Sequence, residues 1–324
     1  MRKILCVLLC VLMLASALVA CGGDKQDPLK IGLGVYTTAS ATDAGEANGK
    51  GQVTMTVAAV LVDANGKIVQ CQIDCADNKV EFTADGKAVA KTEFKTKYEL
   101  GNGYNMVAYG GATKEWFEQA DAFEALCVGK TAAEVLALVV NGDKGTDEVL
   151  NAGCTITINE MALAVEKAVK NAADSTATKA DTLKLGAFTS LESKDATADA
   201  AGQQKLNTTF VAVALDAEGK VTGADTDCVQ VAFGFDAAGK STFDASKAVL
   251  SKRELGMDYN MVAYGGAKLE WFEQADAFEG AIVGKTLTAV KALMGSDLKG
   301  NDEILTAGCT ITIEGFVYAI EKLG

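Results

Sequence analysis

Apolar and polar positions follow a strand-like pattern at the start of each half of the chain. Residues 29–38 alternate, and residues 52–63 (QVTMTVAAVLVD) are rich in β-branched side chains. The tetrapeptide at 63–66 (DANG) is a strong turn signal, and residues 67–74 resume the strand pattern, which predicts a β-hairpin. The stretch 39–51 is small, polar and glycine-rich, and predicts a loop.

The same pattern returns in the second half. Residues 208–216, a turn at 217–219 and residues 220–227 repeat the hairpin. Asp85-Gly86 and Ala238-Gly239 mark a further turn in each half. At least three strands per half are therefore expected.

The pattern then changes to a helical period. Residues 114–127 (KEWFEQADAFEALC) have apolar positions at i, i+3 and i+4 spacing, which predicts an amphipathic helix. Thr131 followed by Glu134 is a capping box for a second helix, and a last helix is expected over residues 157–172. Strands followed by helices predict an α+β fold, with an antiparallel sheet and helices packed on one side of it in each of two tandem copies.

Self-similarity defines these copies. Residues 104–124 and 259–279 are identical at 19 of 21 positions with a shift of 155. We place the first repeat at 29–172, a polar linker at 173–182 and the second repeat at 183–324. Each repeat, of about 140 residues, is long enough to bury its own core.

The first 20 residues form a separate segment. Arg2 and Lys3 precede the apolar run 4–20, which predicts a secretory signal peptide at 1–20. The sequence at 18–21 (LVAC) resembles the lipobox of bacterial lipoproteins, which implies that Cys21 is lipidated and that residues 21–28 form a tether. The resemblance implies a bacterial cell-envelope protein, extracytoplasmic and anchored to the membrane through its N-terminal lipid.

Charge and composition remove several classes of function. The net charge is −13, and about −15 without Arg2 and Lys3, which argues against a nucleic-acid partner. The chain has no histidine, and so lacks the commonest metal ligand, the usual general base and any Ser–His or Cys–His pair. We expect no metal and no hydrolytic catalytic site.

Six cysteines lie outside the predicted signal peptide and lipid site. Cys71 and Cys127 have no counterpart in the other repeat, whereas a disulfide scaffold would be denser and more symmetrical. We expect mostly buried free thiols. The six are Cys71, Cys75, Cys127, Cys154, Cys228 and Cys309.

The identical loops at 104–112 and 259–267 (YNMVAYGGA) are one candidate site. Their aromatic residues and the following tryptophan form a possible wall for a flat ligand, or they pack onto the adjoining helix. The residues are Tyr104, Tyr109 and Trp116 in the first repeat and Tyr259, Tyr264 and Trp271 in the second.

The carboxylates of the amphipathic helix are a second candidate. Paired carboxylates could perform acid–base chemistry, but their spacing places them mainly on the outer side of the helix, which favours a solvated face. They are Glu115, Glu118, Asp121 and Glu124, with Glu270, Glu273, Asp276 and Glu279 in the second repeat.

The third candidate is a doubled AGCTIT step at 152–157 and 307–312. Gly153 and Gly308 allow a tight turn, and a helix start there would present free N–H groups to a phosphate beside the hydroxyls of Thr155 and Thr310. The alternative is a glycine-assisted helix start with Thr157 as N-cap.

At this step the chain resembles the FMN-binding domain family, which includes tandem-domain bacterial lipoproteins of electron transfer. The shared features are the hairpin, the glycine-containing loop, the helices and a small-Gly-small-Thr motif before a terminal helix. The resemblance implies FMN held through a phosphoester to Thr155 and Thr310 and installed by a separate flavin transferase. It places Gly153, Cys154 and Thr157 at the same site. In the second repeat the equivalent residues are Gly308, Cys309 and Thr312.

The motif departs from the family pattern. Alanine replaces serine at 152 and 307, and cysteine replaces alanine at 154 and 309. The family's acidic residue is Val149 here and Ile304 in the second repeat, while Asp147 and Asp302 lie two residues too early.

Two classes of function follow from the sequence. The first is a non-catalytic redox carrier that passes electrons outward from a membrane dehydrogenase through flavin on threonine. The alternative is a cofactor-free surface or solute-binding lipoprotein, or one with a purely structural role.

Overall fold

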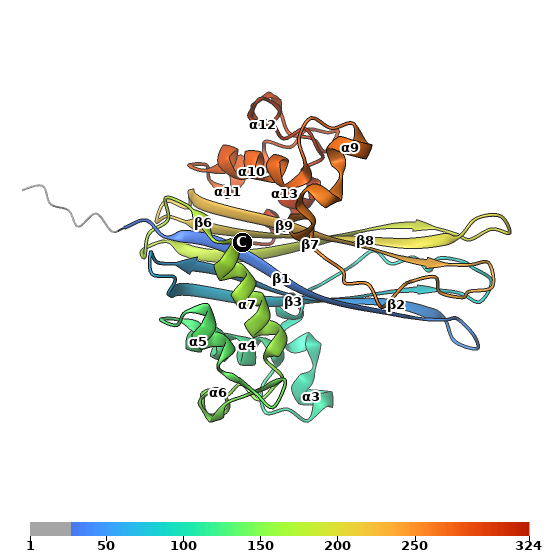
Figure 1. Cartoon of the computed structure of the whole chain (residues 1–324), viewed down its shortest axis with the longest axis horizontal. Coiled ribbons are helices and arrows are strands. Elements are labelled where there is room, and N and C mark those ends of the chain that lie inside the picture. Colours follow the sequence, from blue (N-terminus) through green and yellow to red (C-terminus); the bar gives the residue numbers. More distant parts are fainter. Residues whose placement is uncertain (1–26, 324) are drawn as a thin grey trace, which may run out of the picture.

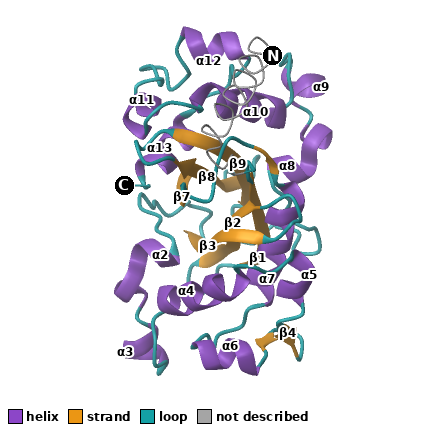
Figure 2. Cartoon of the chain, turned by 90° about the vertical axis from the view of Figure 1, so that its left-hand side faces the viewer, coloured by secondary structure: helices purple, strands orange, loops and turns teal. Residues whose placement is uncertain are grey.

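The computed structural model describes residues 27–323, so the predicted signal peptide and Cys21 lie outside the described residues. The fold is α+β, with two antiparallel sheets stacked face to face and a helical layer on the outer face of each (Figure 1). Viewed from the side, the strands lie between the two helical layers (Figure 2). No helix within residues 27–323 is long and apolar enough to cross a membrane.

Each half contributes three long strands, as the sequence predicts. The first sheet has the order β3-β2-β1-β6 and the second the order β7-β8-β9, with antiparallel pairing throughout. The predicted hairpin is confirmed as β2 and β3, and its repeat as β8 and β9. The strands are β1 (Lys30–Thr42), β2 (Gly49–Val62), β3 (Ile68–Phe82), β6 (Ala173–Asp174), β7 (Thr182–Lys194), β8 (Gly202–Leu215) and β9 (Val221–Phe235).

The helices of the two layers correspond one to one, and a short hairpin, β4 (Val139–Val140) with β5 (Lys144–Gly145), lies in the first layer. The first layer holds α2 (Lys97–Leu100), η1 (Gly101–Tyr104), α3 (Met106–Gly110), α4 (Trp116–Cys127), α5 (Ala132–Leu136), α6 (Asp147–Ala152) and α7 (Asn159–Asn171). The second holds α8 (Lys252–Leu255), η2 (Gly256–Tyr259), α9 (Met261–Gly265), α10 (Trp271–Ile282), α11 (Leu287–Lys291), α12 (Asp302–Ala307) and α13 (Glu314–Glu321).

The two halves share a central core. Alternate side chains of β2, such as Met55 and Val57, pack against residues of the second sheet, such as Phe210, in one buried cluster. The intervening side chains, such as Ala58 and Val60, pack under the helices of the first half. Since β2 is buried on both faces, its end reads as a nearly continuous apolar run. The helices cover one side of each sheet, and the other half of the molecule covers the opposite side.

The predicted loop at 39–51 is wrong over most of its length. Strand β1 continues to Thr42 and β2 begins at Gly49, because Ala39 and Ala41 are small enough to pack against the shared core. Together the sheets extend beyond the helical layers, toward the right of Figure 1. There Phe82 stacks on Phe235 with ring centroids 4.5 Å apart, which joins the two sheets.

Glycines allow the last helix of each half to touch its sheet. A Cβ on Gly34 would lie 2.4 Å from the backbone oxygen of Ala164 in α7, and one on Gly186 would lie 2.3 Å from that of Ala319 in α13. Such separations exclude any side chain at these strand positions.

The predicted linker, residues 173–182, is folded against both sheets. Its first residues form β6, which pairs with the start of β1. The backbone N–H of Thr176 donates to Thr222 of β9, and Ala177 is fully buried. The absence of apolar periodicity therefore reflects a short extended segment held by backbone hydrogen bonds.

Matching ion pairs cross between the halves. Lys167 of α7 contacts Glu254 of α8, with Nζ 2.5 Å from Oε1, and the equivalent Lys322 contacts Glu99 of α2. The two halves are thus related by an approximate two-fold arrangement in which each terminal region contacts the other half.

The helix carboxylates divide evenly between the solvated face that the sequence predicts and positions that are buried or half-buried. Those on the solvated face are Glu118, Asp121, Glu273 and Asp276. Glu115 and Glu270 are buried, and each accepts two backbone N–H groups at the start of α3 or α9, so they hold these short helices in place. Glu124 accepts the N–H of Ile73 at 2.6 Å, and Glu279 pairs with Arg253. Backbone donors and one arginine, which periodicity does not reveal, make this burial possible.

Glu124 is expected to make stability depend on pH. Burial, assisted by the charges of Asp121 and Asp74, raises its pKa from 4.5 to about 8, although the Ile73 N–H opposes the shift. The folded protein therefore keeps a proton that the unfolded chain loses, so stability falls as the pH rises from about 4.5 to about 8. Glu124→Gln removes this dependence and is expected to be the more stable variant at the upper end of that range, as measured by urea unfolding across it.

Glu321→Gln, at an exposed position, is the matched control and should leave the slope of stability against pH unchanged. An unchanged slope in Glu124→Gln would contradict the assignment.

Candidate functional site

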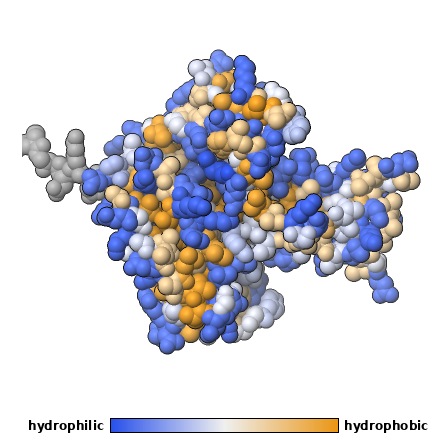
Figure 3. Space-filling model, viewed as in Figure 1, coloured by the Kyte–Doolittle hydropathy of each residue, from blue (hydrophilic) through white to orange (hydrophobic). Residues whose placement is uncertain are grey.

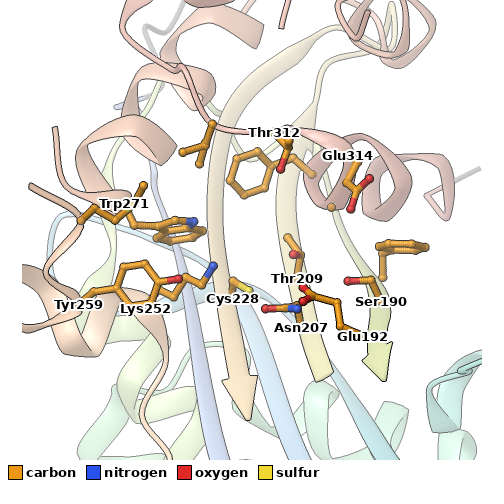
Figure 4. A pocket seen from close by; sticks show the side chains of 15 residues that line it. Ser190, Glu192, Asn207, Thr209, Cys228, Lys252, Tyr259, Trp271, Thr312 and Glu314 are labelled. Carbon is orange, nitrogen blue, oxygen red and sulfur yellow. The ribbon is translucent and has the colours of Figure 1, made fainter. Parts of the chain in front are cut away.

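Each half contains a cavity between the outer face of its sheet and its helical layer. The cavity of the second half has a volume of about 290 Å³ and that of the first about 210 Å³. Equivalent residues line both cavities. In each half, the sheet, the short helices (α2 and η1, or α8 and η2) and the loop before the last helix contribute side chains at matching positions. In the second half the lining residues include Asn207, Thr209, Cys228, Lys252, Tyr259, Trp271, Thr312 and Glu314 (Figure 4).

A lysine lies between two aromatic rings at one end of each cavity. The Nζ atom of Lys252 is 4.9 Å from the ring centroid of Tyr259 and 5.2 Å from that of Trp271. The equivalent Lys97 is 5.2 Å from Tyr104 and 5.5 Å from Trp116. Burial lowers the pKa of Lys252, but Cys228 and Tyr259 raise it by more, so the net shift is upward and the ammonium stays charged.

Carboxylates occupy the opposite end of the second-half cavity. Figure 4 shows Glu192 and Glu314 across the second-half cavity from Lys252. Glu192 pairs with Lys205 at 2.7 Å. In the first half Glu160 accepts a hydrogen bond from Thr56 Oγ1 at 3.1 Å. The second-half cavity is therefore polarised along its length.

The predicted aromatic wall is present in part. Tyr104, Trp116, Tyr259 and Trp271 line the cavities. Tyr109 and Tyr264 do not, and each is 88% exposed, so their assignment to the wall is wrong. Left-handed residues bracket α3 and α9, as at Gly111 (φ 68°) and Gly266 (φ 67°), and these short helices carry the two tyrosines outward.

The AGCTIT step does not open the terminal helix. Gly153 and Gly308 adopt φ values of 98° and 115°, and they cap the C-termini of α6 and α12. The last helix starts only at Asn159 in the first half, with Ile158 as N-cap, so the expected cap by Thr157 is wrong. A left-handed glycine ends a helix more readily than it begins one. Thr157 and Thr312 instead line the cavities.

The two candidate threonines are exposed, and each is held by a buried glutamine. Thr155 donates to Gln119 Oε1 from its backbone N–H at 2.8 Å and from Oγ1 at 3.0 Å. Thr310 makes the same bonds to Gln274, at 2.8 and 2.9 Å. The glutamines are 1% exposed, and each donates through Nε2 to the backbone oxygen of the residue five positions before it.

Sequence reasoning missed Gln119 and Gln274. The available signal was a polar residue on the buried face of the amphipathic helix, between Trp116 and Ala120, in both copies. Such a residue requires a hydrogen-bond partner, which here is the threonine loop.

The remaining motif positions serve packing. Cys154 and Cys309 are fully buried, and burial raises the pKa of each thiol to about 11, so neither faces a ligand. Val149 and Ile304 lie in the core, at the place where the family pattern has an acidic residue. All six cysteines are free, as expected.

Within residues 27–323 no group of three or more histidine, cysteine, aspartate or glutamate side chains could hold a metal ion.

Comparison with known proteins gives one partial similarity. The chain is 34% identical over 96 residues to a protein named chlorophenol reductase from Desulfitobacterium hafniense. The match covers 26% of this chain and 29% of that protein, so the chain corresponds to less than a third of its length. No family model matches the chain, and no solved structure matches it.

The residues present fit FMN in two respects. Thr310 is exposed and directly precedes Ile311 and Thr312, which line the cavity, so a ligand attached to Thr310 would lie within reach of it. The aromatic rings and the ammonium at one end of the cavity suit a flat ring that carries hydrogen-bond acceptors. The volumes of about 290 Å³ and 210 Å³ lie just below and well below the usual range of ligand pockets, so each cavity suits at most a ring system with its side chain outside.

Proposed function

We propose that this protein is a lipid-anchored electron carrier with one FMN on Thr155 and one on Thr310. The observation that carries the proposal is the exposed threonine hydroxyl beside an aromatic, cationic cavity, repeated in both halves. Bound FMN would supply reversible electron transfer, and the protein would fix the phosphate and surround the ring.

The residues around the threonine prepare it for modification. Because the hydroxyl proton of Thr310 points to Gln274, the oxygen lone pairs face away from the buried amide. Gln274 is neutral and cannot take the hydroxyl proton, so the base belongs to the enzyme that attaches the flavin. A base supplied by another enzyme agrees with a separate flavin transferase as partner.

The setting of the chain supports a redox role. The protein it partly matches is named as a reductase. Lipid on Cys21 would place the two domains outside the cytoplasm beside the membrane, within reach of a membrane dehydrogenase that donates electrons. The shared core would hold both sites on one rigid body.

The first test is the protein purified from a host that has a flavin transferase. We expect a flavin absorbance spectrum and a mass gain of two FMN groups, each less one water. A colourless protein of unmodified mass, made beside a positive control that is flavinylated in the same cells, would overturn the proposal.

The departures from the family motif favour one other function. Since Val149 and Ile304 replace the acidic residue and lie in the core, the loop lacks one group that the family uses. A protein without covalent flavin would be a solute-binding lipoprotein that uses the same cavities. That function predicts no flavin absorbance, and loss of ligand binding in Trp116→Ala and Trp271→Ala.

A further inference from the structure

An ammonium without an acidic partner lies in each cavity. Among residues 27–323 neither Lys97 nor Lys252 is in an ion pair, although Lys167 and Lys322 each pair with a glutamate. The chain has 43 acidic and 30 basic residues, so acidic partners are abundant. A largely buried charge is costly unless it is paired, so an unpaired ammonium that faces a cavity points to an anionic occupant.

The neighbours of the ammonium determine the shape of that occupant. Tyr259 and Trp271 stand within 5.2 Å of Lys252 in the second half, and the same two residue types flank Lys97. Their rings offer flat apolar faces, which suit a planar ring. The carboxylates Glu192 and Glu314 lie at the far end, so a negative charge is favourable only near the lysine.

We infer that each cavity binds a planar heteroaromatic ring whose negative charge lies beside the lysine. The anionic ring of reduced flavin is therefore bound more tightly than the neutral oxidised ring. The inference deepens the proposed function, on which it rests only for the naming of the ring as flavin. A site that prefers the reduced ring also raises the reduction potential of the bound flavin above that of the free one.

The test uses the two tryptophans of the chain, because each lies in one cavity. In a protein with Thr155→Ala and Thr310→Ala no covalent flavin forms, and Trp116→Phe leaves Trp271 to report the second cavity. Riboflavin is the probe, since it has no phosphate and any charge preference then belongs to its ring. The affinity for riboflavin is measured from the quenching of Trp271 fluorescence. One titration uses riboflavin oxidised in air, and the other uses riboflavin reduced anaerobically with dithionite.

The reduced ring is expected to bind at least about tenfold more tightly than the oxidised ring in this background. Lys252→Met should weaken the binding of reduced riboflavin by roughly tenfold to a hundredfold, which is the contribution of a charge-assisted hydrogen bond. It should change the affinity for oxidised riboflavin by less than about threefold. Lys97→Met is the matched control and should leave the signal of Trp271 unchanged. Lys252→Arg keeps the charge and should keep the preference, which guards against a folding defect in Lys252→Met.

Equal affinity for both forms, equal weakening of both by Lys252→Met, or no binding at all would overturn the inference. The proposed function and this inference can fail independently of each other. Wild-type protein without covalent FMN that still prefers reduced riboflavin would refute the carrier and keep the binding site. Flavinylated protein whose potential is unchanged by Lys252→Met would do the reverse.

Discussion

Thr310→Ala is expected to remove the FMN of the second half completely and leave that of the first half in place. In the proposed carrier the threonine oxygen would be the only atom of the attachment bond that the protein supplies, so neighbouring groups would not compensate for its loss. Thr155→Ala should remove the other FMN, and the double variant should be colourless. Intact-protein mass after co-expression with a flavin transferase measures each loss as one FMN less one water.

Thr312→Ala is the matched control for this series. Thr312 lies in the same loop and lines the cavity, but it makes none of the hydrogen bonds to Gln274. Both flavins should therefore remain. Thr310→Ser restores the hydroxyl and should restore attachment at least in part. Full flavinylation of Thr310→Ala would show that another residue carries the cofactor.

Arg253→Met is expected to lower the free energy of unfolding by about 3 kcal/mol, the lower end of the cost of breaking a buried ion pair. Arg253 is the one arginine after the predicted signal peptide, and its guanidinium contacts three carboxylates. Glu279 lies 2.5 Å and Asp276 2.8 Å from its nitrogens. Asp225, the third, also accepts the N–H of Leu33 in the other half at 2.7 Å. The side chain is 20% exposed, which moderates the effect.

The reason for this cost is the charge left behind. Burial raises the pKa of Asp225 well above its usual range, and burial raises that of Glu279 to about 7 even with the arginine present. Without Arg253 these groups must either keep an unpaired buried charge or take up protons. The deficit should therefore be largest above pH 7 and shrink as the pH falls through about 7, the pKa of Glu279, because protonation removes the unpaired charges.

Urea unfolding at pH 7 measures the change in stability. A triple variant, Arg253→Met with Asp225→Asn and Glu279→Gln, should recover part of the loss, since it removes the uncompensated charges together. Tyr98 stands in the equivalent place in the first half without a guanidinium, so Tyr98→Phe provides a matched control with a small effect. A loss below about 1 kcal/mol in Arg253→Met would contradict this account.

The sequence determined the repeat, the α+β order of elements and the hairpins. The DANG turn at 63–66 has one favoured backbone geometry, and the β-branched runs on either side have one favoured pairing, so local chemistry was sufficient. The amphipathic helix α4 was equally clear from its apolar spacing. The free state of the cysteines followed from their lack of symmetry between the copies.

The polar residues of the site were less predictable. Gln119 and Gln274 were recognisable only as polar residues on a buried face, and the carboxylates of the same helix suggested solvent exposure. Periodicity assigns a face to each side chain, but it does not reveal which backbone N–H group or arginine that face will meet. Lys97 and Lys252 carried no signal at all, because their short helices have no apolar period.

What the sequence by itself determined was therefore the local structure of each half and the threonines that stand at its loop. Only the tertiary structure decided that the two sheets pack face to face, that Gly153 and Gly308 end a helix, and that a lysine, a tyrosine and a tryptophan meet in one cavity. The physical reason is the sequence distance over which each feature is determined. Turns, caps and amphipathic faces depend on neighbours within a few residues, whereas the cavity joins β9, α8, α10 and the loop before α13, segments that come together only when the shared core forms.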